Sequence, residues 1–181
     1  MPPTFEDKPL LSSPDTLALI DTLAARLCAE GEEADNWVVI GIRRGGALVA
    51  QRLWERLSQR LVQRIPIGFL DITFYRDDLD TIGPNPVVGA TDLRMDIDDK
   101  RIILVDDVLF SGRTIRAAMN ALFDYGRPER VDLLVLVDRG GRQLPIQPDH
   151  VGLVVQPEEG EFIKLLDTGE EMHVVRRKIR E

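Results

Sequence analysis

The segment from Arg101 to Met119 contains the residues of this sequence that are best suited to binding and chemistry. It reads RIILVDDVLFSGRTIRAAM, so two adjacent acids, Asp106 and Asp107, stand between a short apolar run and the turn FSGRT at 110–114. Hydroxyl groups, a glycine backbone and an arginine suit a phosphate, whereas paired carboxylates suit a sugar diol or a bound Mg²⁺. A phosphorylated ribose meets both demands.

The elements around this segment explain why its side chains meet. Residues 102–105 are all aliphatic, which predicts a strand buried on both faces of a parallel sheet, with the acids emerging at its carboxyl end. Ligands of open α/β sheets bind at that edge, and a helix that begins near Thr114 turns its positive end toward it. The alternative is that Asp107 and Ser111 merely cap this helix, but the order of strand, acids, turn and helix would then be a coincidence.

The same residues resemble a known family. The run VDDVLFSGRT at 105–114 resembles the phosphoribosyl pyrophosphate motif of the type I phosphoribosyltransferases. The runs LDITFYRDDL at 70–79, FDYGRP at 123–128 and VDRGGRQLPIQPD at 137–149 resemble the PyrR family, whose members regulate pyrimidine operons and are also uracil phosphoribosyltransferases. The resemblance extends from about Trp37 to Val155.

The resemblance implies an α/β fold of the type I phosphoribosyltransferase kind, with a central mostly parallel sheet flanked by helices and a small hood subdomain from the N-terminal and C-terminal segments. After a Pro- and Ser-rich leader, the apolar spacing predicts helices at 17–27, 47–57 and 115–123 and strands at 37–40, 65–74, 131–137 and 151–155, with a loop at 81–91. A chain of 181 residues with 44% hydrophobic content predicts a single domain, 1–181.

The resemblance also implies roles for particular residues. Phosphoribosyl pyrophosphate and UMP are expected to contact Arg43, Arg44, Val105, Asp106, Asp107, Val108, Leu109, Phe110, Ser111, Gly112, Arg113 and Thr114. The expected catalytic residues are Asp106, Asp107 and Arg76, and the expected cofactor Mg²⁺ reaches the two acids indirectly, through phosphoribosyl pyrophosphate. Uracil is expected to bind at Val137, Asp138, Arg139 and Val155.

Two further loops are expected at the same pocket. In GIRRGG at 41–46, glycines permit unusual backbone geometry and the arginines add positive charge, unless these arginines are simply solvated at a helix start. The resemblance implies a cis peptide between Arg43 and Arg44, although family members often have threonine at 44 and sometimes arginine at 45. TFYRDDL at 73–79 resembles a mobile loop whose Arg76 neutralises departing pyrophosphate; otherwise it is a charged turn.

Charge bears on a second function, because PyrR proteins of one bacterial branch bind pyrimidine-operon messenger RNA as dimers when UMP is present. The net charge of −8 argues against indiscriminate binding to nucleic acid. Gly141 and Leu153 stand where that branch usually has histidine and lysine, which weakens the expected RNA contact. The alternatives for the remaining cations are a local basic patch or a solvated edge; the residues concerned are Arg142, His173, Arg176, Arg177 and Lys178.

The remaining expectations concern compartment and assembly. Cys28 is the only cysteine, so an internal disulfide is impossible and the reducing cytoplasm is expected. We expect no membrane partner, because no apolar run approaches the thickness of a bilayer. The resemblance implies a homodimer or larger homo-oligomer. A phosphoribosyltransferase for another base, such as hypoxanthine or orotate, stays open as an alternative.

Overall fold

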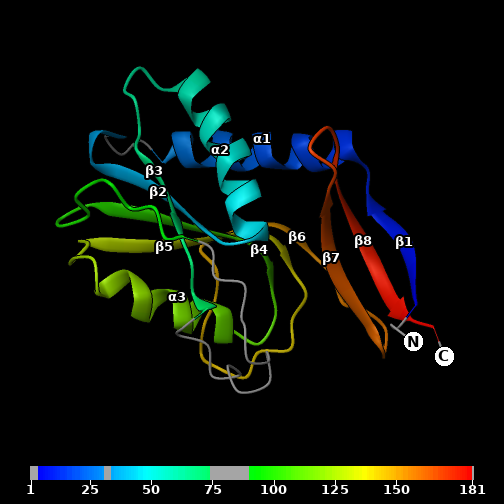
Figure 1. Cartoon of the computed structure of the whole chain (residues 1–181). Helices are drawn as coiled ribbons and strands as arrows, with labels where there is room; N and C mark the ends of the chain where they lie inside the picture. The colour runs from blue at the N-terminus through cyan, green and yellow to red at the C-terminus, as the bar shows by residue number, and fades with distance from the viewer. Residues whose placement is uncertain (1–3, 31–33, 74–89, 181) are drawn as a thin grey trace.

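A five-stranded parallel sheet forms the centre of the computed structural model, which describes residues 4–30, 34–73 and 90–180. Its strands lie in the order β3 (Ile67–Leu70), β2 (Trp37–Ile42), β4 (Arg101–Leu109), β5 (Arg130–Asp138) and β6 (His150–Val154). Helices α1 (Ser13–Ala29) and α2 (Gly45–Arg60) cover one face, and α3 (Arg113–Phe123) covers the other (Figure 1). The predicted α/β class with a mostly parallel sheet is therefore confirmed.

Both faces of the sheet carry an apolar layer. Side chains of β4 alternate between the layers: Ile103 and Val105 face α1 and α2, while Ile102 and Leu104 face α3. Because both faces are covered, β4 has no polar residue among positions 102–105, as expected for a central parallel strand. On α3 the predicted apolar stripe is right at Ile115 and Leu122 but wrong at Phe123, which ends the helix and is 38% exposed.

Two predicted strands differ most from their observed bounds. The strand predicted at 102–105 extends to Leu109 as β4, because β5 continues to pair with it as far as Leu109 and Asp138. The acids Asp106 and Asp107 therefore lie inside the strand and not beyond its end. The strand predicted at 65–74 covers only Ile67–Leu70, since the Asp71 carboxylate accepts the N–H of Thr73 at 2.8 Å and turns the chain. The loop predicted at 81–91 falls largely outside the described residues.

A smaller antiparallel sheet stands at one end of the molecule (Figure 1). It consists of β1 (Phe5–Leu11), β8 (Met172–Ile179) and β7 (Glu161–Asp167), in that order. The local pattern of the Pro- and Ser-rich leader predicts no strand where β1 lies, because the partner strand β8 comes from the far end of the chain. Among the described residues, no helix combines the length and apolarity needed to cross a bilayer.

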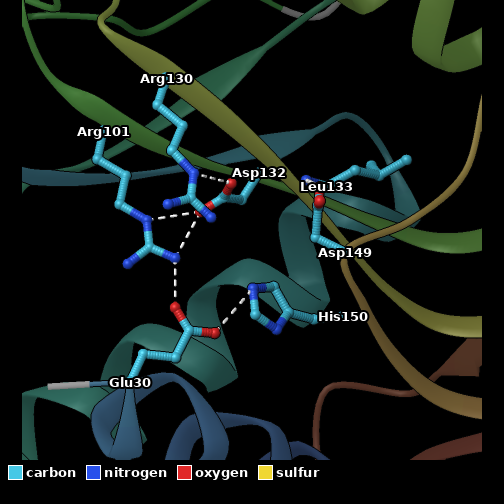
Figure 2. A network of polar contacts seen from close by, with 7 residues as sticks. All are labelled: Glu30, Arg101, Arg130, Asp132, Leu133, Asp149 and His150. Carbon is cyan, nitrogen blue, oxygen red and sulfur yellow. Dashed lines mark hydrogen bonds and ion pairs between the residues drawn. The ribbon is translucent and has the colours of Figure 1, made fainter. Parts of the chain in front are cut away.

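An ionic network joins the first residues of several strands at the amino end of the parallel sheet (Figure 2). The carboxylate of Asp132 accepts the Nε–H groups of Arg101 and Arg130 at 2.5 and 2.6 Å. Arg101 also donates to Glu30 at the end of α1 at 2.6 Å, and its guanidinium lies over the Trp37 ring at 4.9 Å. The side chains of Arg101 and Asp132 are only 5% and 2% exposed, so this network ties α1, β2, β4 and β5 together in a region with little water.

We expect Asp132→Ala to lower the free energy of unfolding by about 3 to 5 kcal/mol, because the change removes a buried carboxylate that two arginines share. Urea unfolding followed by circular dichroism measures the difference. The matched control is Glu55→Ala, whose partner Arg52 lies 3.2 Å away in an exposed pair, and it should cost about 1 kcal/mol or less. Equal effects of the two changes would contradict a stabilising role of the buried network.

Candidate functional site

The turn between β4 and α3 presents backbone groups at the carboxyl edge of the sheet. We call residues 110–114 the phosphate turn. Gly112 precedes α3 with a φ of 90°, a conformation that favours glycine, and it supplies no side chain to cap the helix. Ser111 Oγ accepts the N–H of Arg113 at 3.3 Å. The first turn of α3 therefore directs N–H groups and the positive end of the helix dipole toward this edge, as an anion site requires.

The two acids before this turn differ sharply in their surroundings. Asp106 is 5% exposed, and its Oδ1 accepts the backbone N–H of Asp107 at 3.0 Å. Asp107 is half-buried. Burial, together with the charge of Asp107, holds the pKa of Asp106 well above its usual range. The sequence treats the acids as a pair with one role, whereas the structure gives only Asp107 a partly accessible carboxylate.

Two glycines at the start of α2 allow the helix to lie directly on these acids. A Cβ atom at position 46 would lie 2.5 Å from the carbonyl oxygen of Val105 and 3.0 Å from Oδ1 of Asp106, and a Cβ atom at Gly45 would collide with the Asp107 carboxylate. The sequence attributes these glycines to unusual backbone geometry, and that reason is wrong because neither has a positive φ. They are needed for close approach.

The two arginines that precede α2 differ in their exposure and in their contacts. The peptide bond between Arg43 and Arg44 is cis, as the family resemblance implies. Arg43 is half-buried and lies over the Phe69 ring of β3, 5.3 Å from its centroid, while Arg44 is exposed at the start of α2. Arg43 Nε is buried and has no hydrogen-bond partner within the described part of the chain. Of the two, Arg44 is the more accessible cation in this conformation.

The segment between β5 and β6 packs against the phosphate turn. We call residues 138–146 the base loop. Its backbone N–H groups at Gln143 and Leu144 donate to the Ser111 carbonyl at 3.0 and 3.2 Å, and the side chain of Arg113 donates to Gln143 at 2.9 Å. The expected base-binding residues lie at the start of this loop and beside it: Val137 is buried, and Val155 donates its N–H to the Asp138 carbonyl at 2.9 Å. The two crossover loops therefore form one unit.

Arg139 holds the base loop at its first turn. Its N–H donates to the Leu109 carbonyl at 3.0 Å, and its guanidinium lies over the Phe110 ring, 4.2 Å from the centroid. Burial lowers the pKa of Arg139, and its Nε has no partner among the described residues. This contact between Arg139 and Phe110, which the sequence does not reveal, connects the base loop to the phosphate turn.

Two arginines of the proposed basic patch are not brought to this site, and Arg76 falls outside the described residues. Arg177 of the patch donates to the Asp7 carboxylate at 2.6 and 2.7 Å, and Arg176 lies 3.7 Å from Glu161. Arg142 does lie at the site, where it donates to the Phe110 carbonyl of the phosphate turn and to the Asp138 carboxylate. The positive charges of these three arginines are thus largely compensated, because carboxylates from neighbouring elements lie next to them.

The described residues contain no group of three or more His, Cys, Asp or Glu side chains that could hold a metal ion. Asp107 nevertheless offers the hard oxygen ligand that Mg²⁺ prefers, next to the start of α2. The residues fit a magnesium ion that arrives with its own anionic ligand and is completed by that ligand's oxygens.

Comparison with protein families places this geometry among known proteins. Residues 8–163 match the model of the phosphoribosyl transferase domain. The chain is 46% identical over 157 residues to the bifunctional protein PyrR of Roseiflexus sp. (strain RS-1), covering 87% of this chain and 86% of that protein. It is 42% identical over 156 residues to the bifunctional protein PyrR of Deinococcus radiodurans, covering 86% and 85% of the two chains.

Solved structures show the same fold at lower identity. A hypoxanthine phosphoribosyltransferase from Trypanosoma cruzi superposes with a TM-score of 0.72 at 21% identity, covering 97% of this chain and 95% of that one. A hypoxanthine phosphoribosyltransferase from Staphylococcus aureus superposes with a TM-score of 0.68 at 19% identity, covering 96% and 92%. At these identities the similarity establishes the fold and not the base that is used.

We expect Asp106→Asn to change how stability depends on pH. Because the pKa of Asp106 is raised in the folded state, the folded chain keeps this proton above about pH 4, where the unfolded chain releases it. This contribution of Asp106 to stability is therefore full below about pH 4 and is lost as the pH rises toward the folded-state pKa. The neutral asparagine has no such loss.

Unfolding midpoints at several pH values between about 4 and 8 measure this effect. The midpoint of Asp106→Asn, relative to the unmodified protein, should rise steadily with pH. A difference that does not vary with pH would show that Asp106 is ionised in the folded protein.

Proposed function

The chain belongs to the phosphoribosyl transferase family and, within it, to the bifunctional PyrR proteins, and from this premise we propose that it joins uracil to the phosphoribosyl group of phosphoribosyl pyrophosphate. The products are UMP and pyrophosphate. The observation that carries the proposal is the meeting of the phosphate turn, Asp107 and the base loop at one edge of the sheet.

Each part of the substrate has a matching group along this edge. The 5′-phosphate binds the amides and hydroxyls of the phosphate turn, and the ribose lies next to Asp107. Pyrophosphate lies near the start of α2, where Arg44 and the helix dipole offer positive charge. Arg43, half-buried over the Phe69 ring, adds a second positive charge nearby. We assign uracil to the space beside residues 137–139 and Val155, on the strength of the family resemblance.

Uracil N1 attacks C1′ as the bond to pyrophosphate breaks, and bond breaking runs ahead of bond formation. The N1 proton is taken up by the departing pyrophosphate. Positive charge then develops on the ribose ring, and the Asp107 carboxylate stabilises it. Asp106 orients Asp107, because its buried carboxyl accepts the Asp107 N–H. When bound, Mg²⁺ neutralises charge on the pyrophosphate. We also assign charge neutralisation to Arg76, on the strength of the family resemblance alone.

Incubation with phosphoribosyl pyrophosphate, Mg²⁺ and one base at a time tests the reaction. Uracil should support pyrophosphate release, whereas hypoxanthine and orotate should not. A preference for either of these bases would replace uracil in the assignment, and no release with any base would contradict the transferase activity.

We expect Asp107→Asn to lower kcat about 100-fold with little change in folding, because the substitution removes the charge that faces the ribose and leaves a side chain of the same shape. Steady-state rates of UMP formation measure the loss. Gly45→Ala should act in the same direction, since the atoms nearest to its added methyl group all belong to the Asp107 carboxylate, which would have to move. Near-normal turnover in both folded variants would remove Asp107 from this role.

The second function is regulation of pyrimidine genes through UMP, which agrees with the bifunctional nature of the relatives. We propose that the chain acts as a homodimer or larger assembly and contacts pyrimidine-operon messenger RNA through few cations. The small number of cations is supported by the net charge of −8 and by the pairing of Arg177 with Asp7 and of Arg176 with Glu161. The single cysteine, Cys28, is free and half-buried, which suits a cytoplasmic protein.

We expect the UMP-loaded protein to bind its own pyrimidine leader RNA with a shallow salt dependence. The slope of log affinity against log salt should be about 3 or smaller in magnitude, which corresponds to about four phosphate contacts. Filter binding over a series of salt concentrations measures it. A slope of about 6 or more would contradict the compensated charges of the patch, and the absence of binding would contradict RNA as the partner.

A further inference from the structure

Arg142 occupies the centre of the contact between the phosphate turn and the base loop. Its Nη1 donates to the Phe110 carbonyl at 2.9 Å, its Nε donates to the Ile146 carbonyl at 2.8 Å, and its Nη2 donates to the Asp138 carboxylate at 2.6 Å. One planar guanidinium thus holds the first residue of the phosphate turn together with both ends of the base loop. A lysine has no comparable fork of donors.

The acceptors of Arg142 are themselves fixed. The Asp138 carboxylate also accepts the N–H of Gly140 at 2.9 Å. Burial alone would raise the pKa of Asp138, but the hydrogen bonds from Arg142 and Gly140 outweigh it and the pKa is lowered, so Asp138 stays ionised. The ring of Phe110 is held by Arg139 on one side and approaches Gly141 so closely that a Cβ atom there would lie 2.5 Å from Cε2.

This position differs from that of a nucleic-acid contact. The side chain of Arg142 is 22% exposed, and three of its donors point to groups of its own chain. None of these three hydrogen bonds goes to the first turn of α3 or to Asp106 and Asp107. Its bonds instead connect two crossovers that are separate in the sequence, the turn after β4 and the loop after β5.

The two crossovers bind opposite ends of a nucleotide in the proposed function, on which this inference rests. We propose that Arg142 is a positioning residue that sets the distance between the phosphate turn and the base loop, and thereby makes the binding of phosphate and base cooperative. A ligand that contacts both the phosphate turn and the base loop binds well only when the two loops lie at the right distance from each other. A ligand that contacts only one of them does not depend on that distance.

Binding of ligands of different extent tests the proposal. For Arg142→Gln we expect the affinity for UMP to fall about 10-fold or more, while the affinity for ribose 5-phosphate changes less than about 2-fold, because only UMP spans both loops. Arg142→Lys keeps the charge next to Asp138 but not the fork, and should give an intermediate loss. Arg52→Gln, an exposed arginine on α2, is the matched control and should bind both ligands normally. Isothermal titration calorimetry measures all four proteins.

Hydrogen exchange provides a readout that does not depend on the reaction. In Arg142→Gln the amides of Gln143 and Leu144, which donate to Ser111, should exchange at least about 10-fold faster than in the unmodified protein, while amides of β4 keep their protection. Unchanged exchange, or equal losses for UMP and ribose 5-phosphate, would overturn the role of Arg142. If the unmodified protein forms no UMP, the proposed function is wrong, and the exchange result still decides whether Arg142 joins the two loops.

Discussion

The start of helix α2 lies in direct contact with strand β4, and the arrangement of the site depends on that contact. Side chains at positions 45 and 46 would occupy the space now taken by the Asp107 carboxylate and by the backbone of Val105 and Asp106. With glycines there, a helix N-terminus and two acids share one small region. The positive end of the helix and the negative charge of Asp107 then lie close enough to act on the same ligand.

The other half of the site is built by two loops that stabilise each other. The phosphate turn has no side-chain cap for α3, and beyond Asp138 at the end of β5 the base loop contains neither helix nor strand, so each loop depends on the other for rigidity. Backbone hydrogen bonds to Ser111, the stacking of Arg139 on Phe110 and the three bonds of Arg142 join them. A rigid pair of loops lowers the cost of ordering when a nucleotide binds, because the geometry exists beforehand.

Charge is used differently at the two ends of the parallel sheet. At the amino end, the buried carboxylate of Asp132 is shared by the buried Arg101 and by Arg130, whose side chain is 51% exposed. At the carboxyl end, Asp106 is buried, forms no ion pair within the described part of the chain and has a raised pKa that favours its neutral form, while the buried Nε of Arg43 has no partner there. Paired charges satisfy one another, whereas buried polar groups without a charged partner are typical of a place where a ligand completes the set.

The amino-acid sequence was enough to predict the fold class, the parallel strands and the position of the phosphate turn, because these follow from local periodicity and from a contiguous motif. The resemblance to a family also indicated the cis peptide before α2. Local patterns placed the strand at 102–105 but not its continuation to Leu109, since that length depends on pairing with β5. They missed β1, whose partner β8 lies at the other end of the chain.

The difference between Asp106 and Asp107, the reason for Gly45 and Gly46, and the bonds of Arg142 were decided by tertiary structure alone. Each depends on atoms that are distant in the sequence and come together only when α2, β4 and the base loop pack. Burial and hydrogen bonding are properties of that packing. A sequence lists which groups are present, whereas the folded chain determines which of them are withdrawn from water.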